Sequence, residues 1–170
     1  MPVTIRQAVV SDLPAIRQVA EGTWPVAYAG MISAAQIAYM LDMMYSMDAL
    51  HEQLAKGHIF HLAEDGGRPV GFAGFEHHYT DGRTRLHKLY VLPALKGTGL
   101  GRRLVERVVQ ATLRSGDRAI ELNVNKRNPA VRFYHHLGFT IERDEVLDIG
   151  QGFVMDDHVM LLQLTGPTTG

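Results

Sequence analysis

Hydrophobic residues recur along this chain with two different periods. Alternating or short apolar runs are typical of strands, and they predict strands at residues 3–8, 58–64, 70–78, 86–92, 118–124, 139–143 and 153–162. Apolar residues three or four positions apart are typical of amphipathic helices. Four segments show that helical spacing: Leu13, Ile16, Val19 and Ala20; Ile37, Met40, Leu41 and Met44; Leu50 and Leu54; and Leu104, Val105, Val108, Val109 and Leu113.

Cap and turn residues separate these segments. Ser11 or Asp12, with Pro14 in the first turn, begins the first helix, and Gly22 is expected to end it before an aromatic loop over 23–30. Ser33 is expected to cap the second helix.

Glycine turns at 65–69 and 80–82 join three strands as antiparallel hairpins. Gly71 and Gly74, inside one of these strands, indicate a bulge or a close backbone approach. A short helix from Asn128 or Pro129 to Leu137 precedes the last two strands. The order of elements predicts a mixed α/β fold, with a central sheet flanked by helices, in a single domain over 1–165 with a loose tail at 166–170.

Three glycines at every second position, Gly97, Gly99 and Gly101, follow the strand at 86–92 and precede a helix. The free N–H groups of the first helical turn and the positive end of the helix dipole favour an anion there, so we interpret this loop as a phosphate or pyrophosphate site. A P-loop requires Lys-Ser or Lys-Thr after the glycines, which is missing. A dinucleotide fingerprint requires a small residue where Arg102 stands.

Composition narrows the class of protein. The 170 residues are 46% hydrophobic, which suits one domain with a substantial core. A net charge of −1 gives no electrostatic reason to expect nucleic acid or an anionic membrane as partner. With no cysteine, a disulfide framework and a thiol nucleophile are excluded. We find neither a signal peptide nor a membrane-spanning run, so a cytoplasmic protein is expected.

Two motifs resemble those of the GNAT N-acetyltransferases. Lys96-x-x-Gly99-x-Gly101 resembles the family's acetyl-CoA pyrophosphate loop, Gln/Arg-x-x-Gly-x-Gly/Ala, with Lys in place of Gln or Arg. Residues 123–139, Asn-Val-Asn-Lys-Arg-Asn-Pro-Ala-Val-Arg-Phe-Tyr-His-His-Leu-Gly-Phe, resemble its V-N-x-x-N-x-A-x-x-F-Y-x-x-x-G-F segment. The predicted order of elements matches the GNAT fold, so the resemblance covers nearly the whole chain.

The resemblance implies a cofactor site for acetyl-CoA. In this family the strand before the glycine loop splays from its neighbour, and pantetheine adds to the freed backbone, here that of Leu89, Tyr90 and Val91. The amide of Asn128 would bond the pantetheine arm or act as a plain helix cap. Because Asn128 lies one residue nearer to Tyr134 than in many members, Asn125 is the other candidate. The pyrophosphate would lie on the N–H groups of Lys96, Gly97, Thr98, Gly99, Leu100 and Gly101, with Arg102 nearby.

The same resemblance makes Tyr134 the general acid, which protonates the departing CoA thiolate after direct attack by an amine. The two positions where family members carry a catalytic carboxylate hold Arg85 and Asn123. Glu76, acting through water, and His78, whose ordinary pKa suits base work, are the remaining candidates. Neighbouring histidines on a strand face opposite sides, so His77 and His78 are not expected to share a metal ion, and no metal is predicted.

The acceptor is expected to be a primary amine. Trp24 and Tyr28 are candidates for the wall of its cleft, although Trp24 could equally be a core anchor. Segments 24–47 and 148–160 resemble bacterial polyamine acetyltransferases, and Asp156 and Asp157 are either attractants for a cationic amine or surface charges. Peptide N-terminal amines, other small amines, and acyl-CoA binding without catalysis are alternatives. The methionine-rich segment 40–47 forms core packing, a lid or a homodimer contact.

Overall fold

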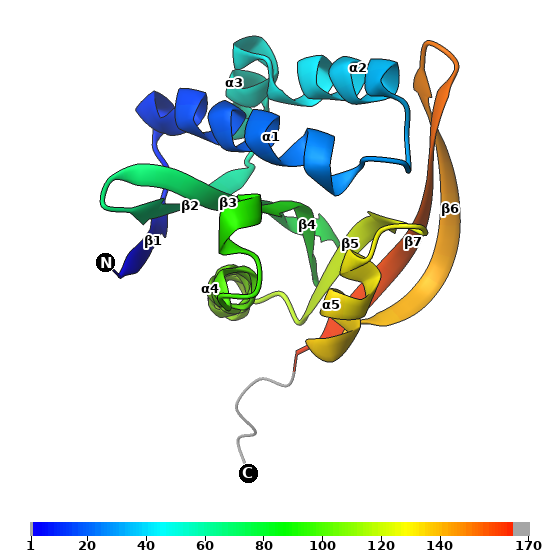
Figure 1. Ribbon diagram of the computed structural model, residues 1–170. Coiled ribbons are helices and arrows are strands. Elements are labelled where there is room, and N and C mark those ends of the chain that lie inside the picture. Colours follow the sequence, from blue (N-terminus) through cyan, green and yellow to red (C-terminus); the bar gives the residue numbers. More distant parts are fainter. Residues whose placement is uncertain (1, 165–170) are drawn as a thin grey trace.

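The structure, a computed structural model, describes residues 2–164, so the expected tail at 166–170 lies outside the described residues. Over this range the strands form one mixed sheet in the order β1-β2-β3-β4-β5-β7-β6, in which only β4 and β5 are parallel (Figure 1). The strands are β1 (Val3–Gln7), β2 (Ile59–Asp65), β3 (Arg68–Thr80), β4 (Arg83–Val91), β5 (Ala119–Asn125), β6 (Thr140–Gly150) and β7 (Phe153–Gln163).

Helices cover both faces of the sheet. The three N-terminal helices lie on one face, and the other two lie on the opposite face (Figure 1). Their bounds are α1 (Leu13–Ala27), α2 (Ala34–Tyr45), α3 (Met47–Ala55), α4 (Leu100–Ser115) and α5 (Ala130–His136), and short 3-10 turns cover Val10–Asp12 and Pro93–Leu95. None of the described helices is both long and apolar enough to cross a membrane.

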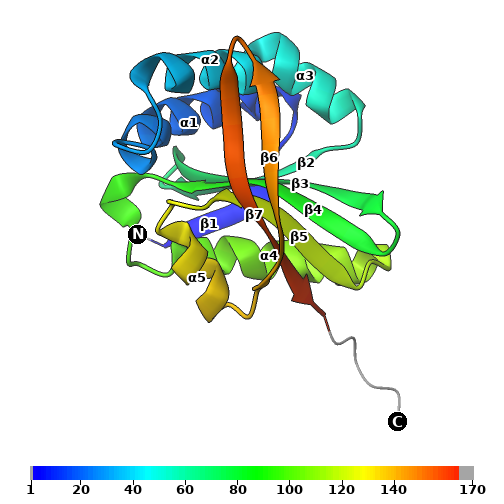
Figure 2. The same cartoon turned by 90° about the vertical axis from the view of Figure 1, so that its right-hand side faces the viewer.

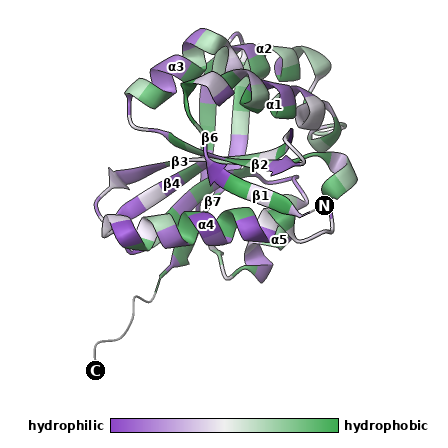
Figure 3. Ribbon diagram, turned by 90° about the vertical axis from the view of Figure 1, so that its left-hand side faces the viewer, coloured by the Kyte–Doolittle hydropathy of each residue, from purple (hydrophilic) through white to green (hydrophobic). Residues whose placement is uncertain are grey.

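Each face of the sheet has its own hydrophobic core. On the α1–α3 side, the core includes Trp24, Tyr45 and Phe72. On the α4–α5 side it includes Leu104 and Phe139. Hydrophobic and hydrophilic residues alternate along α4 (Figure 3), as expected of a helix with one face on a sheet and the other in water.

The parallel strands β4 and β5 pair over three residues and then separate. Their register runs from Arg83 opposite Ala119 to Arg85 opposite Glu121 and stops there, while β4 stays paired with β3 as far as Val91. The remainder of the β4 edge that faces β5 therefore has no strand partner, and the predicted splay is confirmed.

The predicted irregularity inside β3 is also confirmed. The register between β3 and β4 shifts between Gly74 and Phe75, so that His87 is skipped in the pairing. A Cβ at Gly74 would lie 2.8 Å from Cε1 of Phe60 on β2, a distance at which atoms clash. Only glycine lets the bulged strand lie this close to the ring.

The first helix is longer than its sequence predicts. We expected Gly22 to end it, but α1 continues through Trp24 and Pro25 to Ala27, so the expected loop from residue 23 is wrong. Gly22 serves packing instead, because a Cβ there would lie 3.1 Å from the Leu92 side chain. Pro25 is tolerated because it lies in the last turn and removes only one helical hydrogen bond. The predicted cap is confirmed, since Ser33 Oγ accepts a 3.0 Å hydrogen bond from Gln36 N.

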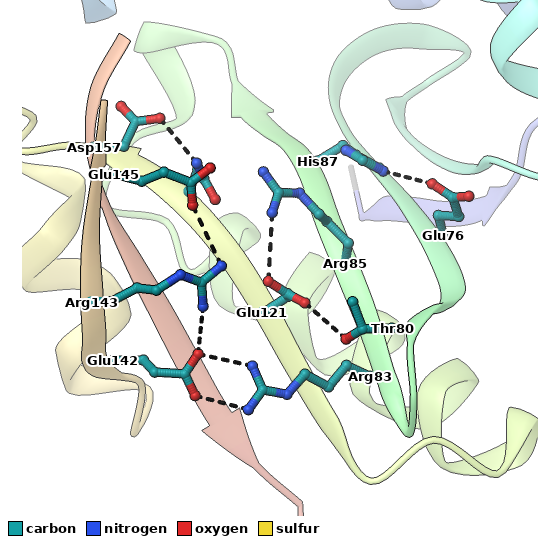
Figure 4. Close-up of polar contacts among 11 residues, drawn as sticks. Glu76, Thr80, Arg83, Arg85, His87, Glu121, Glu142, Arg143, Glu145 and Asp157 are labelled. Atoms are coloured by element: carbon teal, nitrogen blue, oxygen red, sulfur yellow. Dashed lines mark hydrogen bonds and ion pairs between the residues drawn. The ribbon is translucent and has the colours of Figure 1, made fainter. Parts of the chain in front are cut away.

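The sixth strand is also longer than expected. The alternation predicted a strand over 139–143, but β6 extends to Gly150 and pairs with β7 along its length. β6 is an edge strand with largely exposed side chains, and its charged residues form ion pairs, including Arg83 with Glu142 at 2.8 Å (Figure 4). Charged edge residues protect the sheet from aggregation, but they also hide the apolar alternation that marks a strand.

Candidate active site

A cavity of about 400 Å³ opens where β4 and β5 separate. Its walls are the β4 segment 85–90, the β5 segment 122–125, aromatic residues of α1, and the β6–β7 hairpin. The hairpin rises beside α2 (Figure 2), and two hydrogen bonds join them: Tyr39 Oη donates to Ile149 O (2.8 Å), and Gln36 Nε2 donates to Val154 O (3.0 Å). Both Ile149 and Val154 line the cavity, so these contacts hold its wall in place.

The open edge of β4 presents backbone groups to the cavity. Leu92 N donates to Val70 O at 2.9 Å, so its backbone faces β3. Because successive strand residues direct their backbone groups to opposite edges, Leu89 and Val91 face the open edge, whereas Tyr90 faces β3. The Tyr90 side chain lies in the α1–α3 core, where Trp24 and Phe72 contact its ring. These features match an edge that can receive an extended ligand as an additional strand.

The glycine loop has the backbone conformation that its sequence predicts. Gly97 and Gly99 have φ of 82° and 86°, and Gly99 is the N-terminal cap of α4. The first N–H groups of this helix have no intrahelical partner and are joined by the positive end of its dipole. The predicted loop residues Lys96, Thr98 and Arg102 are exposed, although Thr98 Oγ1 donates back to Leu95 O (2.6 Å).

Gly101 brings this loop close to α5. A Cβ at Gly101 would lie 3.2 Å from Phe133 Cζ, which is tighter than ordinary van der Waals contact. Phe133 is the residue before Tyr134. The contact therefore fixes the anion-binding end of α4 relative to the helix that carries the candidate acid.

Both candidate asparagines line the cavity, and each uses its side-chain oxygen locally. Asn125 Oδ1 accepts from Arg127 N, and Asn128 Oδ1 accepts from Ala130 N, each at 2.9 Å. These bonds fix the two side chains while leaving each amide nitrogen able to donate. Both the capping interpretation of Asn128 and a donor role toward a ligand are therefore compatible with the geometry.

Tyr134 lies on α5 with its ring between Phe133 and Phe139, and it lines the cavity. Burial raises the pKa of its hydroxyl above the ordinary value of 10. The hydroxyl therefore keeps its proton at neutral pH, which a general acid requires.

Trp24 in α1 and Tyr28, the C-terminal cap of that helix, also line the cavity. Trp24 is fully buried, so it is both a core anchor and a wall residue. The hydroxyls of Tyr28 and Tyr90 are hydrogen-bonded at 2.9 Å. This bond connects the wall to the open β4 strand.

The expected base Glu76 does not line the cavity. Its Oε1 lies 3.0 Å from His87 Nε2 and 3.2 Å from His58 Nε2, and these two imidazoles, which are stacked 4.4 Å apart, do line it (Figure 4 shows Glu76 and His87). Burial lowers the pKa of His58 to about 4 and that of His87 to about 3, so both rings are neutral at pH 7. In the described part of the chain, these three residues alone lie close enough together to hold a metal ion.

His78 lies away from the cavity. It has a φ of 56°, and its Nδ1 and backbone N bond the two carboxylate oxygens of Asp117, each at 2.7 Å. Thr84 Oγ1 also donates to Asp117, at 2.8 Å. The structure thus places His78 in a network at the far end of β3 and does not bring it to Tyr134 or Trp24.

Of three charged residues that line the cavity, Arg85 and Lys88 were not predicted to bind a ligand, and Asp157 was expected to be either an attractant for an amine or a surface charge. Asp157 on β7 is fully buried, and its Oδ2 accepts from Asn123 Nδ2 at 3.3 Å, whereas its neighbour Asp156 is exposed and paired with Lys126. Arg85 and Lys88 form the β4 wall. The period-two alternation along 153–162 is the signal that could have separated Asp157 from Asp156.

An open strand edge, an anion-binding helix start and a buried tyrosine beside one cavity define a fold built to hold an extended, phosphate-bearing acyl donor. The family model for an acetyltransferase (GNAT) domain matches residues 28–155. The chain therefore belongs to the GNAT family and is an acetyl-CoA-dependent N-acetyltransferase, a class whose reaction needs no metal.

Similar proteins support this assignment. An uncharacterized N-acetyltransferase of Mycobacterium tuberculosis is 31% identical over 91% of this chain and 99% of its own length. An L-methionine sulfoximine/L-methionine sulfone acetyltransferase of Salmonella typhimurium is 36% identical, but over only 47% of this chain and 49% of its own. The N-acetyltransferase PaiA of Thermoplasma acidophilum, solved with coenzyme A, superposes with a TM-score of 0.82 at 22% identity, covering 96% of this chain and 99% of its own.

Proposed function

We propose that the acceptor is the primary amine of a small molecule, acetylated in the cavity between β4 and the β6–β7 hairpin. The observation that carries this proposal is the closed wall opposite the β4 edge, where α2 and the hairpin are hydrogen-bonded to each other. The similar Salmonella typhimurium enzyme is named for the small acceptors L-methionine sulfoximine and L-methionine sulfone, and a similar Pseudomonas phage protein is named a 5-NmdU N-acetyltransferase.

Acetyl-CoA supplies a thioester whose carbonyl carbon is attacked by the amine. The C–N bond forms, the C–S bond breaks, and the thiolate leaves. In this proposal Tyr134 donates its hydroxyl proton to the sulfur, which its retained proton and its place on the cavity wall support. The nitrogen loses one proton to water as the amide forms, and Tyr134 regains its proton from the solvent.

The cofactor would bind mainly to backbone groups. We assign the pantetheine arm to the open edge at Leu89 and Val91, with the side-chain amides of Asn125 and Asn128 as further donors. The pyrophosphate would lie on the N–H groups that begin α4. The unpaired β4 edge and the left-handed glycines support this assignment.

Glu76 enters the proposal as a positioning residue. Its carboxylate oxygen is hydrogen-bonded to His87 Nε2 at 3.0 Å and lies 3.2 Å from His58 Nε2, so it helps to orient both imidazoles, whose rings line the cavity. A polyamine remains the acceptor that the likeness of segments 24–47 and 148–160 suggests, and a peptide N-terminal amine is the other alternative.

A thiol-release assay with acetyl-CoA tests this function against polyamines, amino acids, aminoglycosides and short peptides. We expect release with at least one small amine, and a turnover roughly ten-fold or more lower in Tyr134→Phe with little change in CoA affinity, as is usual for loss of a general acid. Wild-type turnover in Tyr134→Phe would remove the acid assignment. Release with peptides alone would contradict the small acceptor.

A further inference from the structure

One end of the cavity contains a buried carboxylate with an oxygen that lacks a partner. Asp157 is fully buried, and its Oδ1 has no hydrogen-bond partner, nor does Oδ1 of the adjacent Asn123. A buried acceptor atom without a donor is unfavourable, because it has lost its hydrogen bonds to water. Two such acceptors side by side on the cavity wall indicate a ligand that brings N–H groups, as an amino group does.

The opposite wall, formed by β4, contains two cations. Arg85 Nε is buried without a partner, and the nearest acid, Glu121, lies 3.5 Å from Nη1 (Figure 4). Lys88 is only 7% exposed. Its Nζ hydrogen-bonds Gln53 and lies 5.2 Å from the centre of the Tyr45 ring, and it forms no ion pair with any described residue. The adjacent imidazoles of His58 and His87 are neutral, so they do not repel an anion.

We infer that the acceptor is a zwitterion, an amine that also carries a carboxylate, with its amino group on Asp157 and Asn123 and its carboxylate on Arg85 and Lys88. This inference rests on the proposed function and names its substrate class. Between these two ends the wall formed by α2 and the hairpin includes Met40, Met44 and Met155, so we assign an acceptor amino acid with an apolar side chain.

The charges disfavour a polyamine at the same position. A second ammonium group of a polyamine would face Arg85 and Lys88. Like charges held close together in a partly buried cavity repel more strongly than they do in water. An acidic partner such as Asp157 serves only one of the ammonium groups.

A matched pair of acceptors tests the inference on the unmodified enzyme. L-Phenylalanine and 2-phenylethylamine share the amine and the ring, and only the first carries a carboxylate. L-Methionine and 3-(methylthio)propylamine share the amine and the thioether and differ in the same way. We expect kcat/KM in thiol release to be at least ten-fold higher for the amino acid of one pair. Equal or better use of the decarboxylated amines, or preference for spermidine, overturns the zwitterion and leaves N-acetylation intact. If no thiol is released with any of the twenty amino acids or any of the amines, both the zwitterionic acceptor and the proposed acetylation of a small amine are overturned.

Arg85→Gln identifies the carboxylate site. We expect kcat/KM for the amino acid to fall at least ten-fold while that for the decarboxylated amine changes less than two-fold, with partial recovery in Arg85→Lys. Arg143→Gln is the matched control, because Arg143 pairs with Glu142 and Glu145 on the exposed edge and does not line the cavity. Equal losses for both acceptors in Arg85→Gln would show that Arg85 supports the fold and does not bind the carboxylate.

Discussion

The two halves of the proposed site are built from different parts of the chain and with different groups. The proposed cofactor half is almost entirely backbone, from the open β4 edge, which lines the cavity, to the glycine loop, which does not, and its sequence is nearly continuous. The acceptor half is made of side chains from α1, α2, β4, β5 and the β6–β7 hairpin. A local motif can therefore predict the first, whereas the second exists only once distant strands have paired.

The largest expected effect lies in the cofactor half. Gly101→Val would bring a branched side chain against Phe133, 3.2 Å from the position of the new Cβ, and into the loop that we propose receives the pyrophosphate. We expect CoA affinity, measured by calorimetry, to fall at least 100-fold.

Gln110→Val is the control for this substitution. It places the same residue on an exposed position of α4, where valine has a lower helix propensity than the glutamine it replaces, and is expected to bind CoA normally. Unchanged CoA affinity in Gly101→Val would mean that the cofactor does not use the start of α4.

In the acceptor half, adjacent aspartates provide the sharpest comparison. Asp157→Asn removes the buried charge that we propose faces the amine, and we expect kcat/KM for the acceptor to fall about 100-fold, because a hydrogen bond to a charged group contributes roughly 1.5–3 kcal/mol, with CoA affinity unchanged. Burial raises the pKa of Asp157, so its ionised form is unfavourable in the folded state. Thermal stability should therefore not fall.

Asp156→Asn is the matched control, because this residue lies on the other face of β7 and is exposed. We expect its kinetics to stay within two-fold of wild type. If kcat/KM falls equally in both variants, the acceptor responds to the total negative charge of the hairpin and not to a contact with Asp157.

This contrast also explains how far the sequence could predict the site. The conformations of Gly97 and Gly99 and the place of Tyr134 beside the cavity follow from short motifs, because the loop and α5 are determined locally. The alternation along 153–162 can separate the face of Asp157 from that of Asp156, but the place of Asp157 opposite Asn125 depends on the pairing of β7 with β5. No local pattern specifies that register.

The expected bases show a second reason why the sequence could predict only part of the site. Glu76 and His78 were chosen by their place on a strand, but the β3–β4 register is irregular between Glu76 and Thr80, and His78 has a positive φ. Such irregularities break the alternation by which the direction of a side chain is inferred. The sequence did not predict that α1 continues past Gly22, for a related reason. In a sequence, a glycine needed for close packing cannot be distinguished from a glycine that ends a helix.

The smallest expected effect concerns Lys88, where function and stability should change in opposite directions. Burial lowers the pKa of Lys88 from 10.5 to about 7. Between these values the unfolded chain binds a proton that the folded chain does not. Burial of this lysine therefore lowers the free energy of unfolding by its full amount below pH 7, and the loss shrinks as pH rises from 7 to 10.5. Lys88→Met should thus raise the free energy of unfolding by at least about 1 kcal/mol below pH 7, with the gain shrinking toward pH 10.

The same substitution should weaken the acceptor half at pH 6.5, where the ammonium is charged and able to hold a carboxylate. We expect kcat/KM for the preferred amino acid to fall several-fold in Lys88→Met, while that for its decarboxylated amine is unchanged. Lys56→Met, which removes an exposed lysine that pairs only with Glu52, should leave both quantities as they are. A Lys88→Met enzyme that is more stable and equally selective would show that Lys88 is a tolerated buried charge without a ligand. Greater stability combined with lost selectivity would show that the fold keeps an unfavourable charge because the acceptor needs it.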